Sequence, residues 1–147
     1  MIDVDVPLLT HEHKRLPLRE AAGERGLVAV GVGRASGRGF EMLHHFAAAC
    51  DRLDASGVNV VFVYPAQSAR HVQDSLSVIA ARYRRKPSLL LDDAGRFFGD
   101  ALPVHLLRAI RLDRQMACIE TTAVNVRDSD WDGRLREFLL KAGADAA

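Results

Sequence analysis

Short apolar runs alternate along this chain with longer segments that have helical periodicity. Three aliphatic, partly β-branched runs, 27–32, 58–64 and 88–91, have the length and composition of buried strands. Helices are predicted between them, from about Arg38 to Asp54 and from about Ser68 to Arg85, because apolar residues recur there every three or four positions. Strands that alternate with full-length helices are expected to lie parallel in one sheet, joined by right-handed crossovers.

The start of the chain predicts an antiparallel pair. An apolar stretch, 4–9, is followed by a polar turn, 10–14, and a second short apolar segment, 16–18. A helical turn then ends at Gly23. We therefore expect an N-terminal hairpin ahead of the first core strand.

The end of the chain predicts a second hairpin and a closing helix. Residues 106–112 and 116–122 read as the two strands of the hairpin. The helix begins at Ser129 or Asp130, either of which can cap it. Residues after Gly143 are expected to fray.

These elements predict one α/β domain over residues 1–147, with a mixed central sheet, helices on both faces and an N-terminal hairpin. Apolar residues make up 48% of the chain and charged residues 27%, which are values typical of a globular domain. The net charge of +1 does not favour binding to nucleic acid or an anionic membrane. No segment approaches the roughly 18 apolar residues of a membrane span, and the acidic N-terminus is unlike a signal peptide, so the cytoplasm is the expected compartment.

Several local strings, taken in their order, resemble the alkyl hydroperoxide reductase and thiol-specific antioxidant group of peroxiredoxins, within the thioredoxin superfamily. These strings match that family's N-terminal hairpin, its core strands, the segment ahead of a short helix and its late hairpin, and they are 6–9, 16–20, 26–30, 57–63, 88–95 and 111–115. The resemblance covers nearly the whole chain. It implies a three-layer thioredoxin-like fold.

The chain departs from that family where the catalytic cysteine belongs. Peroxiredoxins place a reactive Cys in the first turn of the helix after the first core strand, where the helix N-terminus lowers the pKa of the thiol. The corresponding residues 33–41 contain neither Cys nor Pro. Aligning Glu41 with the Glu that often follows the family's Cys puts Arg38 near the nucleophile's position, and a guanidinium cannot attack a peroxide. The thioredoxin-type cis-Pro is unmatched as well, since Pro103 lies several residues too early.

The resemblance implies a vacated site rather than a catalytic one. Arg108 resembles the family's arginine at the start of the late hairpin, although its spacing to Asp113 differs by about one residue. Backbone N–H groups in the first turn of a helix attract anions. A small anion or a partner's carboxylate is therefore expected at a group of residues from the loop, the helix start and the hairpin, namely Gly33, Arg34, Ser36, Arg38 and Arg108.

Glycines in the same loop allow a dinucleotide-binding alternative. Gly31, Gly33 and Gly37 follow a strand and precede a helix, as in a pyrophosphate-binding turn. The third glycine comes one place late, however, and the strand 58–64 ends without the acidic residue that binds a ribose. A loop left after loss of the Cys-bearing turn explains the glycines better.

Only two cysteines occur, Cys50 and Cys118, far apart and in no CxxC pair. This number excludes a disulfide framework and a cysteine zinc site. Cys50 falls on the apolar face of the first helix and Cys118 within a strand, so both thiols are predicted to face the core.

No metal site or cofactor is predicted. His11 and His13 lie two apart in a turn, and two ligands do not define a site. His44 and His45 are adjacent on a helix, about 100° apart, and cannot easily share one metal.

The sequence leaves three functions open. The first is a non-catalytic peroxiredoxin-like module that binds a protein partner and forms a homodimer. The second is a divergent thiol oxidoreductase or peroxidase that uses Cys50 or Cys118. The third is a binder of a small anion or nucleotide at the loop from Gly33 to Gly39.

Overall fold

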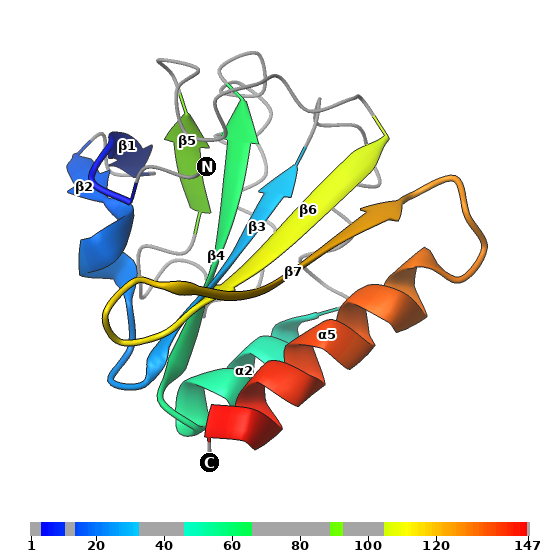
Figure 1. The fold of residues 1–147 in the computed structure, drawn as a ribbon. Helices are drawn as coiled ribbons and strands as arrows, with labels where there is room; N and C mark the ends of the chain where they lie inside the picture. Colours follow the sequence, from blue (N-terminus) through cyan, green and yellow to red (C-terminus); the bar gives the residue numbers. More distant parts are fainter. Residues whose placement is uncertain (1–3, 11–13, 33–45, 66–88, 93–104, 147) are drawn as a thin grey trace.

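A computed structural model describes residues 4–10, 14–32, 46–65, 89–92 and 105–146, and a seven-stranded sheet forms its centre (Figure 1). The strand order is β2-β1-β5-β4-β3-β6-β7. The strands are β1 (Pro7–Thr10), β2 (Arg15–Pro17), β3 (Gly26–Val32), β4 (Val58–Pro65), β5 (Leu89–Asp92), β6 (Leu106–Leu112) and β7 (Cys118–Asn125). The helices are the 3-10 turn η1 (Leu18–Ala21) and the α-helices α2 (Ala47–Ala55) and α5 (Trp131–Ala146).

The sheet is mixed, as the sequence predicts. The core strands β3, β4 and β5 run parallel to one another. The antiparallel pairs are β1 with β2, β1 with β5, β3 with β6, and β6 with β7. Both the N-terminal hairpin and the late hairpin are therefore confirmed.

One face of the sheet is covered by α2 and α5, which lie side by side (Figure 1). Successive strand residues point to opposite faces, so Val28, Val30 and Val32 share the face that the helices cover. Phe46, at the start of α2, and Trp131, at the start of α5, make an edge-to-face contact in which the ring centroids are 6.2 Å apart. The two helices thus pack against each other as well as against the sheet.

The other face of the sheet packs against the N-terminal residues. Leu27 and Ala29 of β3 contribute to this second apolar cluster together with Leu8 of β1 and Leu18 of η1. The long helices within the described residues, α2 and α5, both belong to the first face. The helix predicted over 68–85 lies outside the described residues, as does the part of the first predicted helix before Phe46.

The late hairpin has a longer turn than predicted, because β7 begins at Cys118 instead of Met116. Met116 has a φ of 65°, in the left-handed region, which interrupts the strand. The Asp113 carboxylate accepts hydrogen bonds from the backbone N–H groups of Gln115 and Ala117, both at 2.9 Å. An aspartate that accepts such bonds holds its own turn and keeps these residues out of the strand.

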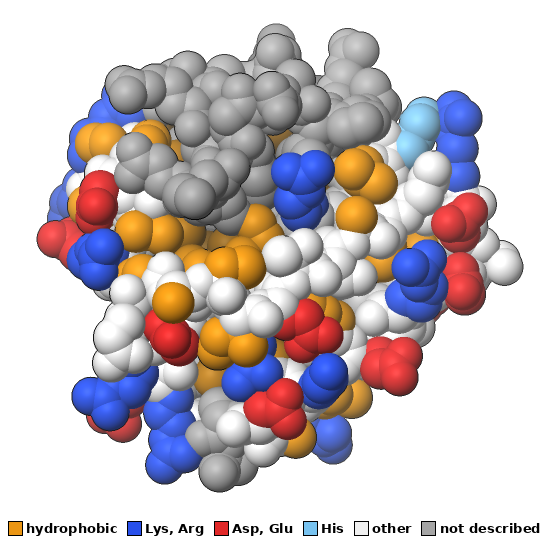
Figure 2. Space-filling model, in the orientation of Figure 1, with side chains coloured by type: hydrophobic (Ala, Val, Ile, Leu, Met, Phe, Trp, Pro, Cys, Tyr) orange, Lys and Arg blue, Asp and Glu red, His pale blue; other side chains and the backbone are white. Residues whose placement is uncertain are grey.

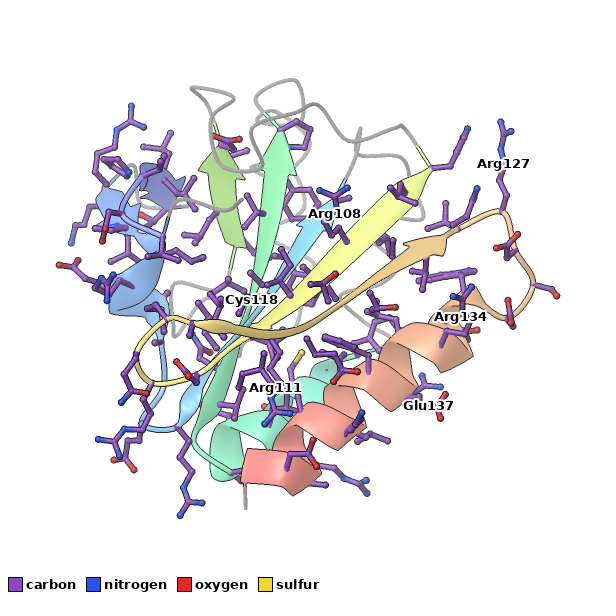
Figure 3. All side chains as sticks on the ribbon, viewed as in Figure 1. Arg108, Arg111, Cys118, Arg127, Arg134 and Glu137 are labelled. Atoms are coloured by element: carbon purple, nitrogen blue, oxygen red, sulfur yellow. The ribbon has the colours of Figure 1, made fainter. Side chains whose placement is uncertain are left out.

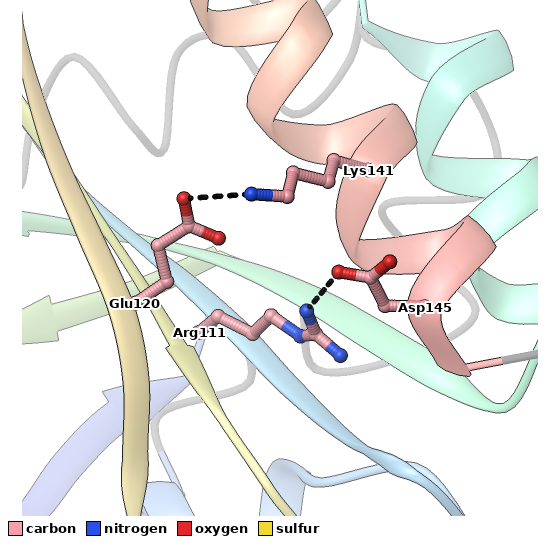
Figure 4. Close-up of polar contacts among 4 residues, drawn as sticks. All are labelled: Arg111, Glu120, Lys141 and Asp145. Carbon is pink, nitrogen blue, oxygen red and sulfur yellow. Dashed lines mark hydrogen bonds and ion pairs between the residues drawn. The ribbon is translucent and has the colours of Figure 1, made fainter.

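The prediction that the chain frays after Gly143 is wrong. Helix α5 runs to Ala146, because its last turns are held by tertiary contacts. Gly143 is buried against Leu53 of α2, and the Asp145 carboxylate pairs with the Arg111 guanidinium at 2.9 Å (Figure 4). Contacts of this kind stabilise a helix end that its local sequence would leave free to fray.

Candidate functional site

The carboxyl ends of the parallel strands meet at the upper edge of the sheet in Figure 1. These ends are Val32 of β3, Pro65 of β4 and Asp92 of β5. In sheets of this kind ligands bind in the crevice beyond the carboxyl ends of the strands. In the sequence, Gly33, the first residue of the predicted site, directly follows Val32 at this edge.

Arg108 is the predicted site residue that the structure places at this edge. In β6 its Cα partners are Gly31, next to the last residue of β3, and Ala123 of β7. Gly33, Arg34, Ser36 and Arg38 lie outside the described residues. The expectation that all five residues come together therefore stays a prediction.

The Arg108 guanidinium has the chemistry to bind an anionic ligand. The side chain is half-buried and has no hydrogen-bond or ion-pair partner within the described part of the chain. Strand alternation puts it on the face that Ile110 shares, opposite to Arg111, which pairs with α5. Figure 3 shows Arg108 in the upper part of the sheet, away from α5. A guanidinium in this position can bind a carboxylate or phosphate through two parallel hydrogen bonds.

Two further polar groups belong to the same end of the sheet. Asp92 is the last residue of β5 and is buried. Its position directly after the predicted strand 88–91 is the signal that could have identified it as part of this edge. Burial raises the pKa of the Tyr64 hydroxyl in β4 far above its usual value, so that this group, protonated at neutral pH, resists ionisation further.

The two cysteines occupy different environments. Cys50 of α2 is fully buried in the helix-side core, as predicted. Cys118 is exposed, and the prediction that it faces the core is wrong. It begins β7, the last strand of the sheet, whose residues are exposed or half-exposed except for Val124. Neither cysteine forms a disulfide.

We expect the two thiols to react with a labelling reagent at very different rates. In native protein one equivalent should react quickly at Cys118, whereas Cys50 should wait for the protein to open, because burial excludes the reagent. Mass spectrometry of timed, quenched samples measures both rates. Cys118→Ala should abolish the fast phase and Cys50→Ala should preserve it; a fast phase that survives Cys118→Ala would contradict the burial of Cys50.

Two searches of the described residues found no site of their kind. No three His, Cys, Asp or Glu side chains in these ranges lie close enough to hold a metal ion. Among the helices of the same ranges, none is long and apolar enough to cross a membrane.

Comparison with known proteins gives structural likeness but no sequence match. No family model matches the chain, and no curated protein matches it. Peroxiredoxin Q of Xanthomonas campestris has a similar structure, with a TM-score of 0.69 at 17% identity over all of this chain and 97% of that one. A putative thiol:disulfide interchange protein DsbE of Chlorobium tepidum has a TM-score of 0.62 at 15% identity, over 97% of this chain and 99% of that one. ScoI of Arabidopsis thaliana with copper bound has a TM-score of 0.59 at 14% identity, over 99% of each chain.

Likeness at such low identity bears on the fold alone. The matches extend over essentially the whole length of both chains in each comparison. They agree with the mixed seven-stranded sheet and with the helices α2 and α5. The chain therefore has a thioredoxin-like fold that matches those of peroxiredoxins.

Proposed function

We propose that this chain is a non-catalytic peroxiredoxin-like domain that acts as a binding and interaction module. The observation that carries the proposal is the placement of its two thiols. Cys50 is fully buried in the core. Cys118 lies five residues along β7 from Ala123, the partner of Arg108, which is about 17 Å at the rise of a strand.

Peroxide reduction by a thiol requires the sulfur and the groups that activate it at one place. The thiolate is the attacking form, and it needs a helix N-terminus or a nearby cation to be populated. The residues that follow β3, 33–41, contain no Cys. Neither Cys50 nor Cys118 substitutes for the missing thiol at the carboxyl edge of the sheet.

We therefore expect no peroxidase or disulfide-reductase turnover above background. The assay follows hydrogen peroxide consumption, and separately disulfide reduction, with a thiol reductant and the full chain. Cys50→Ala and Cys118→Ala should leave both rates at background. Turnover that Cys118→Ala abolishes would overturn the proposal and establish a thiol oxidoreductase, a second candidate function that the exposure of Cys118 favours.

Arg108 favours a small anion, or the carboxylate of a partner, as the ligand of this module. It combines partial burial, a position at the carboxyl edge and the absence of a partner within the described ranges. Partial burial strengthens a charge-assisted hydrogen bond relative to one at the open surface. A nucleotide would bind through the same phosphate chemistry.

Titration with sulfate, phosphate or a nucleotide, followed by backbone amide NMR, tests this ligand. Amide shifts should centre on residues around Gly31 and Arg108 and on 33–40, and Arg108→Ala should weaken binding at least tenfold. Arg114→Ala is the matched control, because Arg114 is exposed in the turn between β6 and β7, at the other end of the sheet. Equal losses in the two variants would indicate unspecific attraction and exclude a site at Arg108.

A further inference from the structure

A surface pocket lies at the end of the sheet opposite to Arg108, beside the turn between β6 and β7. Its volume is about 420 Å³, which is within the range of ligand sites in proteins. Arginines from three segments line it, namely Arg25 ahead of β3, Arg111 of β6 and Arg114 of the turn. In Figure 2 blue side chains gather at the lower left, where Figure 1 shows the start of β3 and this turn. The fold therefore brings cations from distant parts of the sequence to one pocket.

The two carboxylates that line the same pocket are engaged within the chain. Asp113 accepts hydrogen bonds from two backbone N–H groups of its own turn. Asp145 accepts a hydrogen bond of 2.9 Å from Arg111, which uses one of the five N–H donors of that guanidinium (Figure 4). Arg114 has no hydrogen-bond or ion-pair partner within the described residues. Three guanidinium groups beside two engaged carboxylates favour an anionic ligand.

A β-bulge adds an apolar side chain to the pocket. Arg111 of β6 pairs with Glu120 of β7. The next residue, Leu112, pairs with Cys118, so Ile119 has no opposite residue in β6. A bulge of this kind re-aims a side chain relative to the regular alternation of a strand. Ile119 lines the pocket and is 51% exposed, so the ligand that fits here has an apolar part as well as a negative charge.

We propose that this pocket binds the C-terminal end of a partner chain. The terminal carboxylate lies against the guanidinium groups of Arg111 and Arg114, and an aliphatic last side chain lies against Ile119. A guanidinium binds a carboxylate through two parallel hydrogen bonds. Contact with Ile119 covers apolar area that an inorganic anion would leave exposed. The proposal goes beyond the function proposed above, because it requires neither Arg108 nor the absence of catalysis.

The exposure of the pocket favours a chain end over a free small acid. Sites for small molecules enclose most of their ligand. Most residues that line this pocket are exposed, namely Arg25, Arg114, Gln115, Ile119 and Asp145. The remainder of a bound chain can therefore extend into solvent. The side-chain amide of Gln115 can also hydrogen-bond to the peptide group ahead of the last residue.

Backbone amide NMR of the full chain, titrated with a short peptide, tests the site. The probe is an acetylated peptide of glycine and serine that ends in leucine with a free carboxylate. Amide shifts should centre on Arg25, on 111–115 and on Ile119. The same peptide with a C-terminal amide should bind about tenfold more weakly or worse, because it loses charge-assisted hydrogen bonds. Isocaproate, which has the same carboxylate and side chain but no peptide group, should bind about threefold more weakly or worse. Sulfate should compete poorly, because it has no apolar part.

Single substitutions separate the two parts of the site. Arg114→Ala should weaken binding of the peptide about tenfold. Ile119→Ala should weaken it about threefold, since it removes part of the apolar contact. Both side chains are exposed, so circular dichroism should be unchanged. Arg127→Ala is the matched control, because it removes the same charge from an exposed residue just beyond the far end of β7 and should preserve the affinity (Figure 3).

Four results would overturn this proposal. They are the absence of shifts at millimolar peptide, equal binding of the peptide and its amide, effective competition by sulfate, and isocaproate binding as tight as that of the peptide, which would identify a free acid as the ligand. Failure here is distinguishable from failure of the proposed function, because Arg108→Ala should leave peptide binding unchanged. Peroxide turnover would refute the non-catalytic role and leave this site intact. An inactive chain that does not bind the peptide would refute only the site.

Discussion

Gly26→Ala is expected to lower the free energy of unfolding by roughly 2–6 kcal/mol, the sum of backbone strain and a steric clash at about 1–3 kcal/mol each. Gly26 opens β3 with a φ of +133°, a conformation that residues with a side chain rarely adopt. An added Cβ would also lie 2.4 Å from the carbonyl oxygen of Leu112. Both groups belong to the backbone of paired strands, so neither can move without disturbing the β3–β6 ladder.

Urea denaturation followed by circular dichroism measures this loss, and Gly133→Ala is the matched control. Gly133 lies in α5 with open space where a Cβ would stand. The same substitution should there stabilise the protein by up to about 1 kcal/mol, because alanine favours the helix. A neutral Gly26→Ala variant would contradict the close approach of β3 to Leu112.

The core strands could be predicted because their signal is local. The runs at 27–32 and 58–64 are mostly apolar, rich in valine and bounded by glycine or proline, and they match β3 and β4 to within one residue at each end. The end of the first helix, predicted at about Asp54, is also close to the end of α2 at Ala55. The chain turns two residues later at Gly57, which has a φ of +86°. Where a single residue type sets the backbone conformation, the sequence is sufficient.

The exposure of Cys118 could not be predicted in the same way. Whether a strand residue is buried depends on the strands and helices beside it, and hence on strand order. β7 is last in that order, so even its better covered residues are mostly half-exposed. The end of α5 is a similar case, because it depends on Leu53 and Arg111, residues distant in the chain.

In the candidate site, too, some features follow from the local sequence and others depend on how the strands are arranged. The family resemblance assigns Arg108 to the late hairpin, and in the structure this residue of β6 pairs with Gly31 of β3. Asp92 directly follows the predicted strand 88–91, and in the structure it is the last residue of β5, where it pairs with β4 and is buried. A polar residue at the carboxyl end of a buried strand therefore needs the sheet before its surroundings are known.

Leu53→Ala is expected to lower the free energy of unfolding by about 2–5 kcal/mol, as for other buried leucines. Leu53 of α2 is fully buried in the helix-side core. It lies directly against Gly143 of α5, where an added Cβ would stand 3.5 Å from its side chain. The contact thus joins the two helices, and truncation leaves a cavity that the sheet below cannot fill.

Leu140→Ala on α5 is the matched control, because it removes the same atoms from a side chain that is 36% exposed. It should lower the free energy of unfolding by less than about 1 kcal/mol.

Labelling of Cys50 gives a second measurement, because this thiol lies one helical turn from Leu53 in the same core. Where labelling of Cys50 requires opening of the core, each decrease of about 1.4 kcal/mol in the free energy of unfolding should raise the labelling rate about tenfold. Leu53→Ala should therefore accelerate labelling of Cys50 by roughly 30-fold or more and leave the rate at exposed Cys118 unchanged. Equal acceleration by Leu140→Ala would mean that the packing between α2 and α5 does not control access to this thiol.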